Sequence, residues 1–119
     1  MIERLLNEFI EEVNVIGNEE IVFKTKSNKT FKMCHYQDCC EEVFIEDICG
    51  DLQSMVGNRV LMAEMVKSTE PTGDEPYHDE SFTWTFYKLA TMGGYVTIRW
   101  FGTSNGYYSE EVDFVEVTE

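Results

Sequence analysis

The side chains best suited to chemistry gather in residues 33–52, which hold all four cysteines, one of the two histidines and six of the 23 acidic residues. Within this stretch, His35, Cys39 and Cys40 offer an imidazole and two thiols, which are groups that bind Zn²⁺. Cys34 is a poor fourth ligand, because neighbouring residues on a strand point to opposite faces. We expect the protein to work without a cofactor. A metal site with Zn at His35, Cys39 and Cys40 is the alternative.

The same thiols raise the alternative of cysteine chemistry. A nucleophilic cysteine needs a base beside it and a stable thiolate. His35 is the base within reach of Cys39 or Cys40, but the acidic residues around them disfavour a thiolate through like-charge repulsion. We therefore assign no catalytic residue, and the simplest interpretation is that the cysteines fill space as small buried side chains.

A second group of residues suggests binding rather than catalysis. Tyr107, Tyr108, Glu110 and Glu111 follow one another closely near the end of the chain. Tyrosines flanked by carboxylates are typical of protein-binding surfaces that face basic partners. In the simpler interpretation, the tyrosines are half-buried strand residues. These four residues are the candidate protein-binding site.

The charge balance points to the kind of partner. The 23 Asp and Glu residues exceed the nine Lys and Arg residues, for a formal net charge of −14 and a pI near 4.4. This charge disfavours direct binding to nucleic acid or to an anionic membrane, and there is no basic run to release counterions. We expect a basic protein partner. Net charge also promotes solubility, and most of the acidic side chains are expected to be solvated.

The start of the chain, M-I-E-R-L-L-N-E-F-I-E-E, bears on localisation. It places acidic residues where a secretory signal needs a basic start and an unbroken apolar run. No later run approaches the about 18 apolar residues that a transmembrane helix needs. We therefore expect a cytoplasmic protein with reduced cysteines.

The elements that must position these residues are mostly strands. Alternation of apolar and polar residues predicts strands at 13–16, 21–26, 30–36, 43–48, 60–67, 82–87, 95–101 and 107–117, the last with a bulge. Short helices are expected at 2–8 and between Asp51, as N-cap, and Gly57, as the stop. Residues 68–81 form the one long loop.

These elements predict a single domain over residues 1–119, the size of one compact folding unit. The fold class is mainly β (α+β). We expect a single antiparallel, strongly twisted sheet, or a partly open barrel, of about 6–8 strands with two short helices.

Three motifs suggest a family: H-x-Q-D-C-C-E at 35–41, F-Y-K-L-A-T at 86–91 and S-N-G-Y-Y-S at 104–109. With them, the chain from about Phe9 onward resembles a group of small uncharacterised proteins encoded mainly by bacteriophages and prophages. The resemblance implies no activity. It implies a bacterial host cytoplasm and an accessory role in infection.

Together these observations predict a non-enzymatic, acidic protein-binding module, with inhibition of a host protein as one form of its accessory role. Two alternatives stay open. One is a metal-binding or thiol-dependent enzyme that uses residues 35–40. The other is a structural component of a virion.

Overall fold

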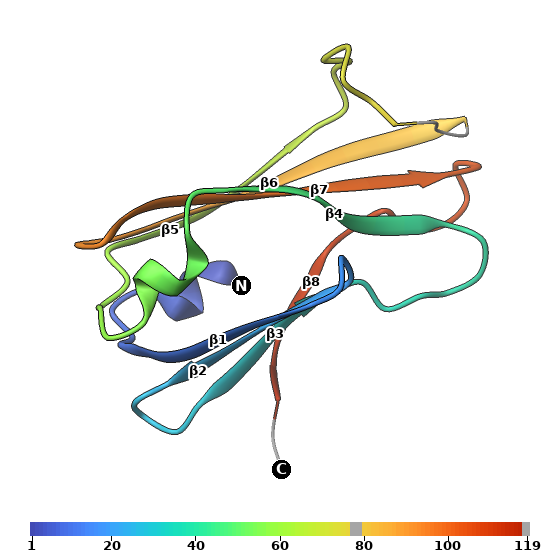
Figure 1. The fold of residues 1–119 in the computed structure, drawn as a ribbon. Coiled ribbons are helices and arrows are strands. Elements are labelled where there is room, and N and C mark those ends of the chain that lie inside the picture. The colour runs from blue at the N-terminus through green and yellow to red at the C-terminus, as the bar shows by residue number, and fades with distance from the viewer. Residues whose placement is uncertain (77–79, 118–119) are drawn as a thin grey trace.

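The computed structural model describes residues 1–76 and 80–117 and contains two β layers (Figure 1). In the first layer the strand order is β1 (Ile10–Ile16), β2 (Glu20–Thr25), β3 (Thr30–Cys34) and β8 (Asp113–Val117). In the second layer the order is β4 (Glu42–Cys49), β7 (Gly94–Ser104), β6 (Ser81–Thr91) and β5 (Met62–Ser68). Neighbouring strands in both sheets are antiparallel. The mainly β class is therefore confirmed.

The single sheet expected from the sequence is wrong, because the chain crosses from one layer to the other. It leaves the first layer through residues 35–41 and returns through residues 105–112, after which β8 pairs with β3. The two sheets do not close into a barrel among the strands described. Alternation in a sequence reports which face of a strand is apolar but not which sheet that strand joins.

The core lies between the two layers. In the first layer, Phe31 and Phe114 stack with their ring centroids 5.4 Å apart. The two layers meet where Trp100 Nε1 of β7 approaches Met33 Sδ of β3 at 3.3 Å. These four side chains are almost completely buried. The apolar face of each sheet is thus covered by the other sheet.

Two short 3-10 turns stand where helices are expected. They are η1 (Ile2–Leu5) and η2 (Leu52–Met55), and Figure 1 shows both at the same end of the gap between the layers. The helix expected at residues 2–8 is wrong, because Asn7 takes a positive φ of 71° and donates its N–H to Val60 O instead of continuing the turn. No helix in the described ranges is long and apolar enough to cross a membrane.

The second turn begins where the sequence predicts but ends before Gly57. The Asp51 side chain accepts a hydrogen bond from Gln53 N at 3.0 Å, as an N-cap should. Gly57 has a φ of 84°, the left-handed conformation that stops a helix. The helix expected between Asp51 and Gly57 is therefore wrong, because Val56 already takes an extended conformation, with φ −65° and ψ 129°, and only the single turn Leu52–Met55 forms.

The hairpin of β6 and β7 confirms the strands predicted at 82–87 and 95–101. Trp84 and Phe101 pack with ring centroids 4.8 Å apart, but both lie outside the core between the layers. Glu75, from the loop before β6, accepts a hydrogen bond from Trp84 Nε1 at 3.0 Å. The long loop predicted at 68–81 therefore packs on the outer face of the second sheet, although its residues 77–79 lie outside the described part.

The C-terminal strand is shorter than expected. The sequence predicts a strand with a bulge at 107–117, whereas β8 begins only at Asp113. Register shifts occur instead in β1, between Ile10 and Glu12, and in β4, between Ile45 and Asp47. Residues 107–112 form part of the second crossover, so the tyrosines predicted there stand on a loop.

Candidate functional site

The two groups of candidate residues meet at one end of the molecule. Glu42 at the start of β4 pairs with Thr103 near the end of β7, so the two crossovers emerge side by side. His35 Nδ1 lies 2.6 Å from Glu111 O, and Tyr36 N donates to Asp113 Oδ2 at 3.1 Å. We call residues 35–41 and 105–112 together the crossover end.

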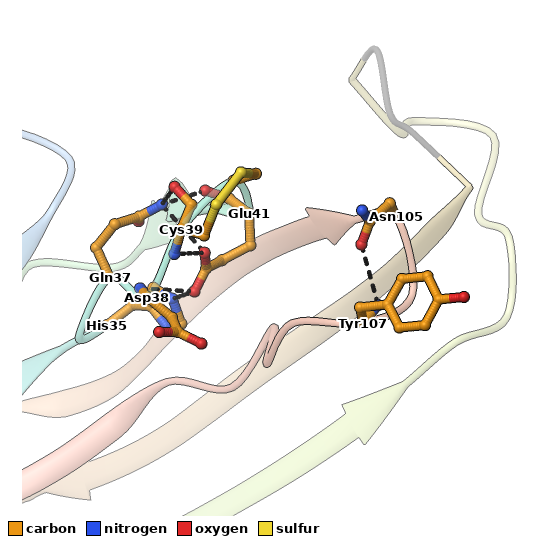
Figure 2. Close-up of a disulfide and its surroundings, with 8 residues drawn as sticks. His35, Gln37, Asp38, Cys39, Glu41, Asn105 and Tyr107 are labelled. Carbon is orange, nitrogen blue, oxygen red and sulfur yellow. Dashed lines mark hydrogen bonds and ion pairs between the residues drawn. A yellow bond between two sulfur atoms is a disulfide. The ribbon is translucent and has the colours of Figure 1, made fainter.

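Glu41 is the buried centre of the first crossover (Figure 2). Its carboxylate accepts hydrogen bonds from His35 Nε2 at 2.8 Å, Cys39 N at 2.9 Å and Asp38 N at 3.0 Å. Burial alone would raise the pKa of this carboxyl, but the hydrogen bonds outweigh burial and lower its pKa to about 2. Glu41 is therefore a carboxylate that holds the turn together.

The role of Glu41 was not predicted from the sequence, because acidic residues are so frequent in this chain. The available signal was its position, six residues after His35 and within the same short crossover. That spacing becomes meaningful only when the turn between the two residues is known. A buried carboxylate and a solvated one look the same in a sequence.

His35 has both ring nitrogens engaged, and its side chain is only 4% exposed. Its two partners, a backbone carbonyl and the Glu41 carboxylate, accept hydrogen bonds but do not donate them. Each ring nitrogen therefore already has a partner within the protein. The imidazole would have to leave one of these partners before it could bind a metal ion or accept a proton from a substrate.

The sulfur atoms of Cys39 and Cys40 are joined in a disulfide on the exposed turn (Figure 2). Reduced thiols were expected at both positions. The two residues are consecutive in the chain, with Cα atoms 3.7 Å apart. Cys34 is buried and free, and Cys49 is exposed and free.

The candidate metal ligands thus have other partners. His35 bonds to Glu41, and Cys39 bonds to Cys40. Across residues 1–76 and 80–117, no group of three His, Cys, Asp or Glu side chains is arranged to hold a metal ion. Zinc at this trio stays a prediction for the reduced protein.

The two candidate tyrosines differ in exposure. Tyr107 is 88% exposed, and its backbone N–H donates to Asn105 Oδ1 at 3.0 Å (Figure 2). Tyr108 is partly buried. An anchored backbone with a solvated ring leaves Tyr107 free to contact another molecule.

The two candidate carboxylates also differ. Glu110 is only 8% exposed, and it accepts hydrogen bonds from Thr83 Oγ1 at 2.7 Å and from Ser104 Oγ at 2.5 Å. Glu111 is exposed and pairs with Lys67 Nζ of β5 at 2.6 Å. The hydrogen bond from this lysine, together with its charge, lowers the pKa of Glu111. Glu110 thus anchors the second crossover, while Glu111 faces solvent.

The fold and the crossover end define a two-layer antiparallel β domain whose candidate site is built by the two segments that change layers. The chain belongs to the family described as "Domain of unknown function (DUF7448)", whose family model matches residues 3–114. Comparisons with curated proteins and with solved structures found no match. Membership of an uncharacterised family agrees with the resemblance, and a phage or prophage origin stays a prediction.

Proposed function

We propose that this protein is a non-enzymatic binding module that presents its crossover end to a basic partner protein. The observation that carries the proposal is Tyr107, whose ring is 88% exposed on a segment held in place by buried groups. Glu110 anchors this segment to Thr83 and Ser104, and Glu111 O is bonded to His35. Because the backbone is held and a tyrosine side chain has only two torsions to fix, the ring should lose little entropy on binding, which suits it to a binding hot spot.

The charge around this ring supports a basic partner. Asp38, Glu42 and Glu111 are exposed at the same end, and the whole chain carries a formal charge of −14. A field of this sign speeds encounter with Lys- and Arg-bearing proteins and weakens as salt is added. Association that slows at high ionic strength is therefore part of the proposal.

The groups that would suit proton or metal chemistry serve another purpose in this proposal. The His35 ring and the Glu41 carboxylate satisfy each other, and both are buried. They fix the loop geometry rather than act on a substrate. This arrangement favours a binding role over the enzymatic alternatives. No specific observation favours the other alternative, a structural component of a virion.

In the proposal, the partner is a host protein in a bacterial cytoplasm, and the protein acts as a phage or prophage accessory factor, for example as an inhibitor. This biological setting rests on the sequence resemblance. The physical claim is narrower, namely that the crossover end recognises Lys- or Arg-rich protein surfaces.

Panning a random-peptide display library over the immobilised protein tests the physical claim. We expect enrichment of sequences with net positive charge, weaker retention at high salt and loss of retention in Tyr107→Ala. Tyr95→Ala is the matched control, because Tyr95 is also a solvated tyrosine, 78% exposed, but lies at the opposite end of β7. The proposal fails if no sequence is enriched over a blank surface, or if the enriched sequences lack Lys and Arg.

A further inference from the structure

Two neighbouring hollows follow the seam between the layers, where the edge strands β5 and β8 face each other. The first is about 470 Å³ and lies between Met65 of β5 and Phe114 of β8. The second is about 400 Å³ and lies between Ser68, at the end of β5, and Tyr108 in the second crossover. Both volumes are large enough to receive amino-acid side chains.

The two hollows share Lys67 and Glu111. The ion pair of these residues, at 2.6 Å, crosses the seam at the point where the hollows meet. Both side chains are exposed, so water screens the attraction between the two charges. The ion pair therefore contributes little stability and can open at little cost in free energy. We call the two hollows together the seam groove, with the ion pair of Lys67 and Glu111 at its middle.

We propose that the seam groove binds an extended segment of the partner protein that carries basic and apolar side chains. This inference rests on the proposed function and names the surface and the kind of partner. β5 is the last strand of the second sheet, and β8 is the last strand of the first. The outer edge of such a strand offers backbone N–H and C=O groups to an incoming strand.

The charged residues that line the seam groove favour a bound segment with positive charge. Glu3, Glu64, Asp113 and Glu111 line the first hollow, whose cations are Lys67 and the Met1 ammonium group. The ammonium group pairs with Glu3 and Lys67 pairs with Glu111, so Glu64 and Asp113 leave the hollow with a net negative charge. A second copy of this chain would bring its own charge of −14 to an acidic surface. Complementarity therefore favours a segment with Lys or Arg over self-association.

The second hollow offers a specific place for one basic side chain. The buried Glu110 carboxylate lines it and receives two hydroxyl hydrogen bonds, one on each oxygen. Two carboxylate oxygens have about four acceptor sites, so lone pairs remain for an ammonium or guanidinium group. A Lys or Arg side chain would place its charge there, next to Thr83 and Ser81.

The first hollow suits an apolar side chain. Ile2, Ala63 and Phe114 line it, together with the ring of Tyr87. The Tyr87 hydroxyl is directed to Val112 O at 3.4 Å, so its polar end is occupied within the protein. An extended segment with an apolar residue and a nearby Lys or Arg would fill both hollows while its backbone follows a strand edge.

Fluorescence anisotropy with a short labelled peptide of alternating Lys and Val residues tests the groove. We expect binding to weaken by about tenfold or more in the double variant Glu64→Gln, Glu111→Gln, because the groove loses two of the carboxylates that attract the Lys side chains of the peptide. The charge-matched control is Glu11→Gln, Glu19→Gln, which removes two exposed carboxylates, one in β1 and one in the turn after it, at the other edge of the first sheet. The control should change affinity by less than about twofold.

Two further probes separate pairing along a strand edge from simple charge attraction. A peptide in which proline replaces the central valine keeps its charge but loses a backbone N–H, so it should bind more weakly. Amide chemical shifts of the wild-type protein should move in β5 and β8 when the alternating peptide is added. This measurement does not depend on any variant folding.

The outcomes are distinct. Equal weakening by the groove and control variants, or shift changes confined to other strands, overturns the groove but leaves the proposed function standing. A molecular mass that doubles with concentration, and a dimer that the groove variants disrupt, would assign the groove to a second copy and overturn the basic occupant. Absence of binding by every basic peptide, including those selected by panning, rejects the proposed function itself.

Discussion

His35 Nδ1 lies 2.6 Å from the carbonyl oxygen of Glu111, although 76 positions separate the two residues in the chain. This bond joins the segment that leaves the first sheet to the segment that returns to it. Two groups of residues that the sequence presents as separate candidates therefore form one structure. A substitution in either segment should therefore perturb the conformation of the other segment.

Replacing Glu41 by Gln should destabilise the protein. The amide keeps one oxygen where the carboxylate has two, so its N–H₂ group would face either Asp38 N or Cys39 N, and that part-buried hydrogen bond would be lost. We expect a clear fall in the urea midpoint of unfolding. Glu42→Gln is the matched control, since Glu42 is exposed and its replacement should leave the midpoint nearly unchanged. Equal midpoints for the two variants would contradict a structural role for Glu41.

Stability should fall in acid, with Glu41 as one cause. The folded-state pKa of Glu41 is about 2, against its ordinary value of 4.5, because hydrogen bonds to the carboxylate outweigh its burial. The unfolded chain therefore binds the proton more tightly, so this stabilisation is present above pH 4.5 and is lost as pH falls toward 2. Glu75, hydrogen-bonded by Thr72, has a pKa lowered to about 2 and adds to the same trend.

Urea unfolding across this acidic range measures the trend. The free energy of unfolding should fall less steeply with decreasing pH in Glu41→Gln than in the wild type, because the variant has lost one of the carboxyls that take up a proton. Superimposable pH profiles would show that Glu41 has an ordinary pKa in the folded protein.

The four cysteines should fall into three classes of reactivity toward a thiol reagent. With an aromatic disulfide reagent at neutral pH, Cys49 should react quickly because it is exposed. Cys34 should react only after unfolding, since burial raises the pKa of its thiol and hides the sulfur. Cys39 and Cys40 should react only after reduction. Three fast thiols in the native, unreduced protein would show that Cys39 and Cys40 are not joined, and zinc binding by that form should then be measured directly.

Replacing Gly102 by Ala should disturb the second crossover. A Cβ atom at this position of β7 would lie 2.7 Å from Glu110 O, which is backbone and cannot rotate away. We expect a loss of about 1–3 kcal/mol in the free energy of unfolding, typical of overpacking. The Tyr107 amide signal should also shift, because the segment must move. A variant as stable as the wild type, with unchanged signals in 105–112, would contradict this close approach.

The strands could be predicted from the sequence because alternation has a direct physical cause. Side chains of a strand point to opposite faces, so a half-buried strand must alternate, and the hairpin of β6 and β7 follows from this rule and from Gly93 and Gly94 at its turn. The assignment of β8 to the first sheet could not be predicted. It depends on contacts such as the stacking of Phe114 on Phe31, which no local pattern contains.

The candidate site was predicted in its parts but not in its arrangement. His35, Tyr107 and Glu111 were identified from residue type and do lie at one end of the molecule. The roles of Glu41 and Glu110 depend on donors that the turns bring to them, so the sequence alone could not separate these two buried acids from the many exposed ones. The strand predicted through Tyr107 had the right composition, but the anchoring of Glu110 to Ser104 bends the chain away from the sheet.

The pairing of β8 with β3 has a consequence for how the protein is made. A ribosome releases β1, β2 and β3 well before β8, so this meander must wait for the intervening chain before its open edge is covered. During that wait, the β3 edge and the apolar side chains Phe31 and Met33 lack the cover that Phe114 later provides. A nascent chain that stalls or is cut before Asp113 would carry an uncovered strand edge into a crowded cell, where another such chain could add to it. Among the strands described, β8 is thus synthesised after the sheet whose edge it protects.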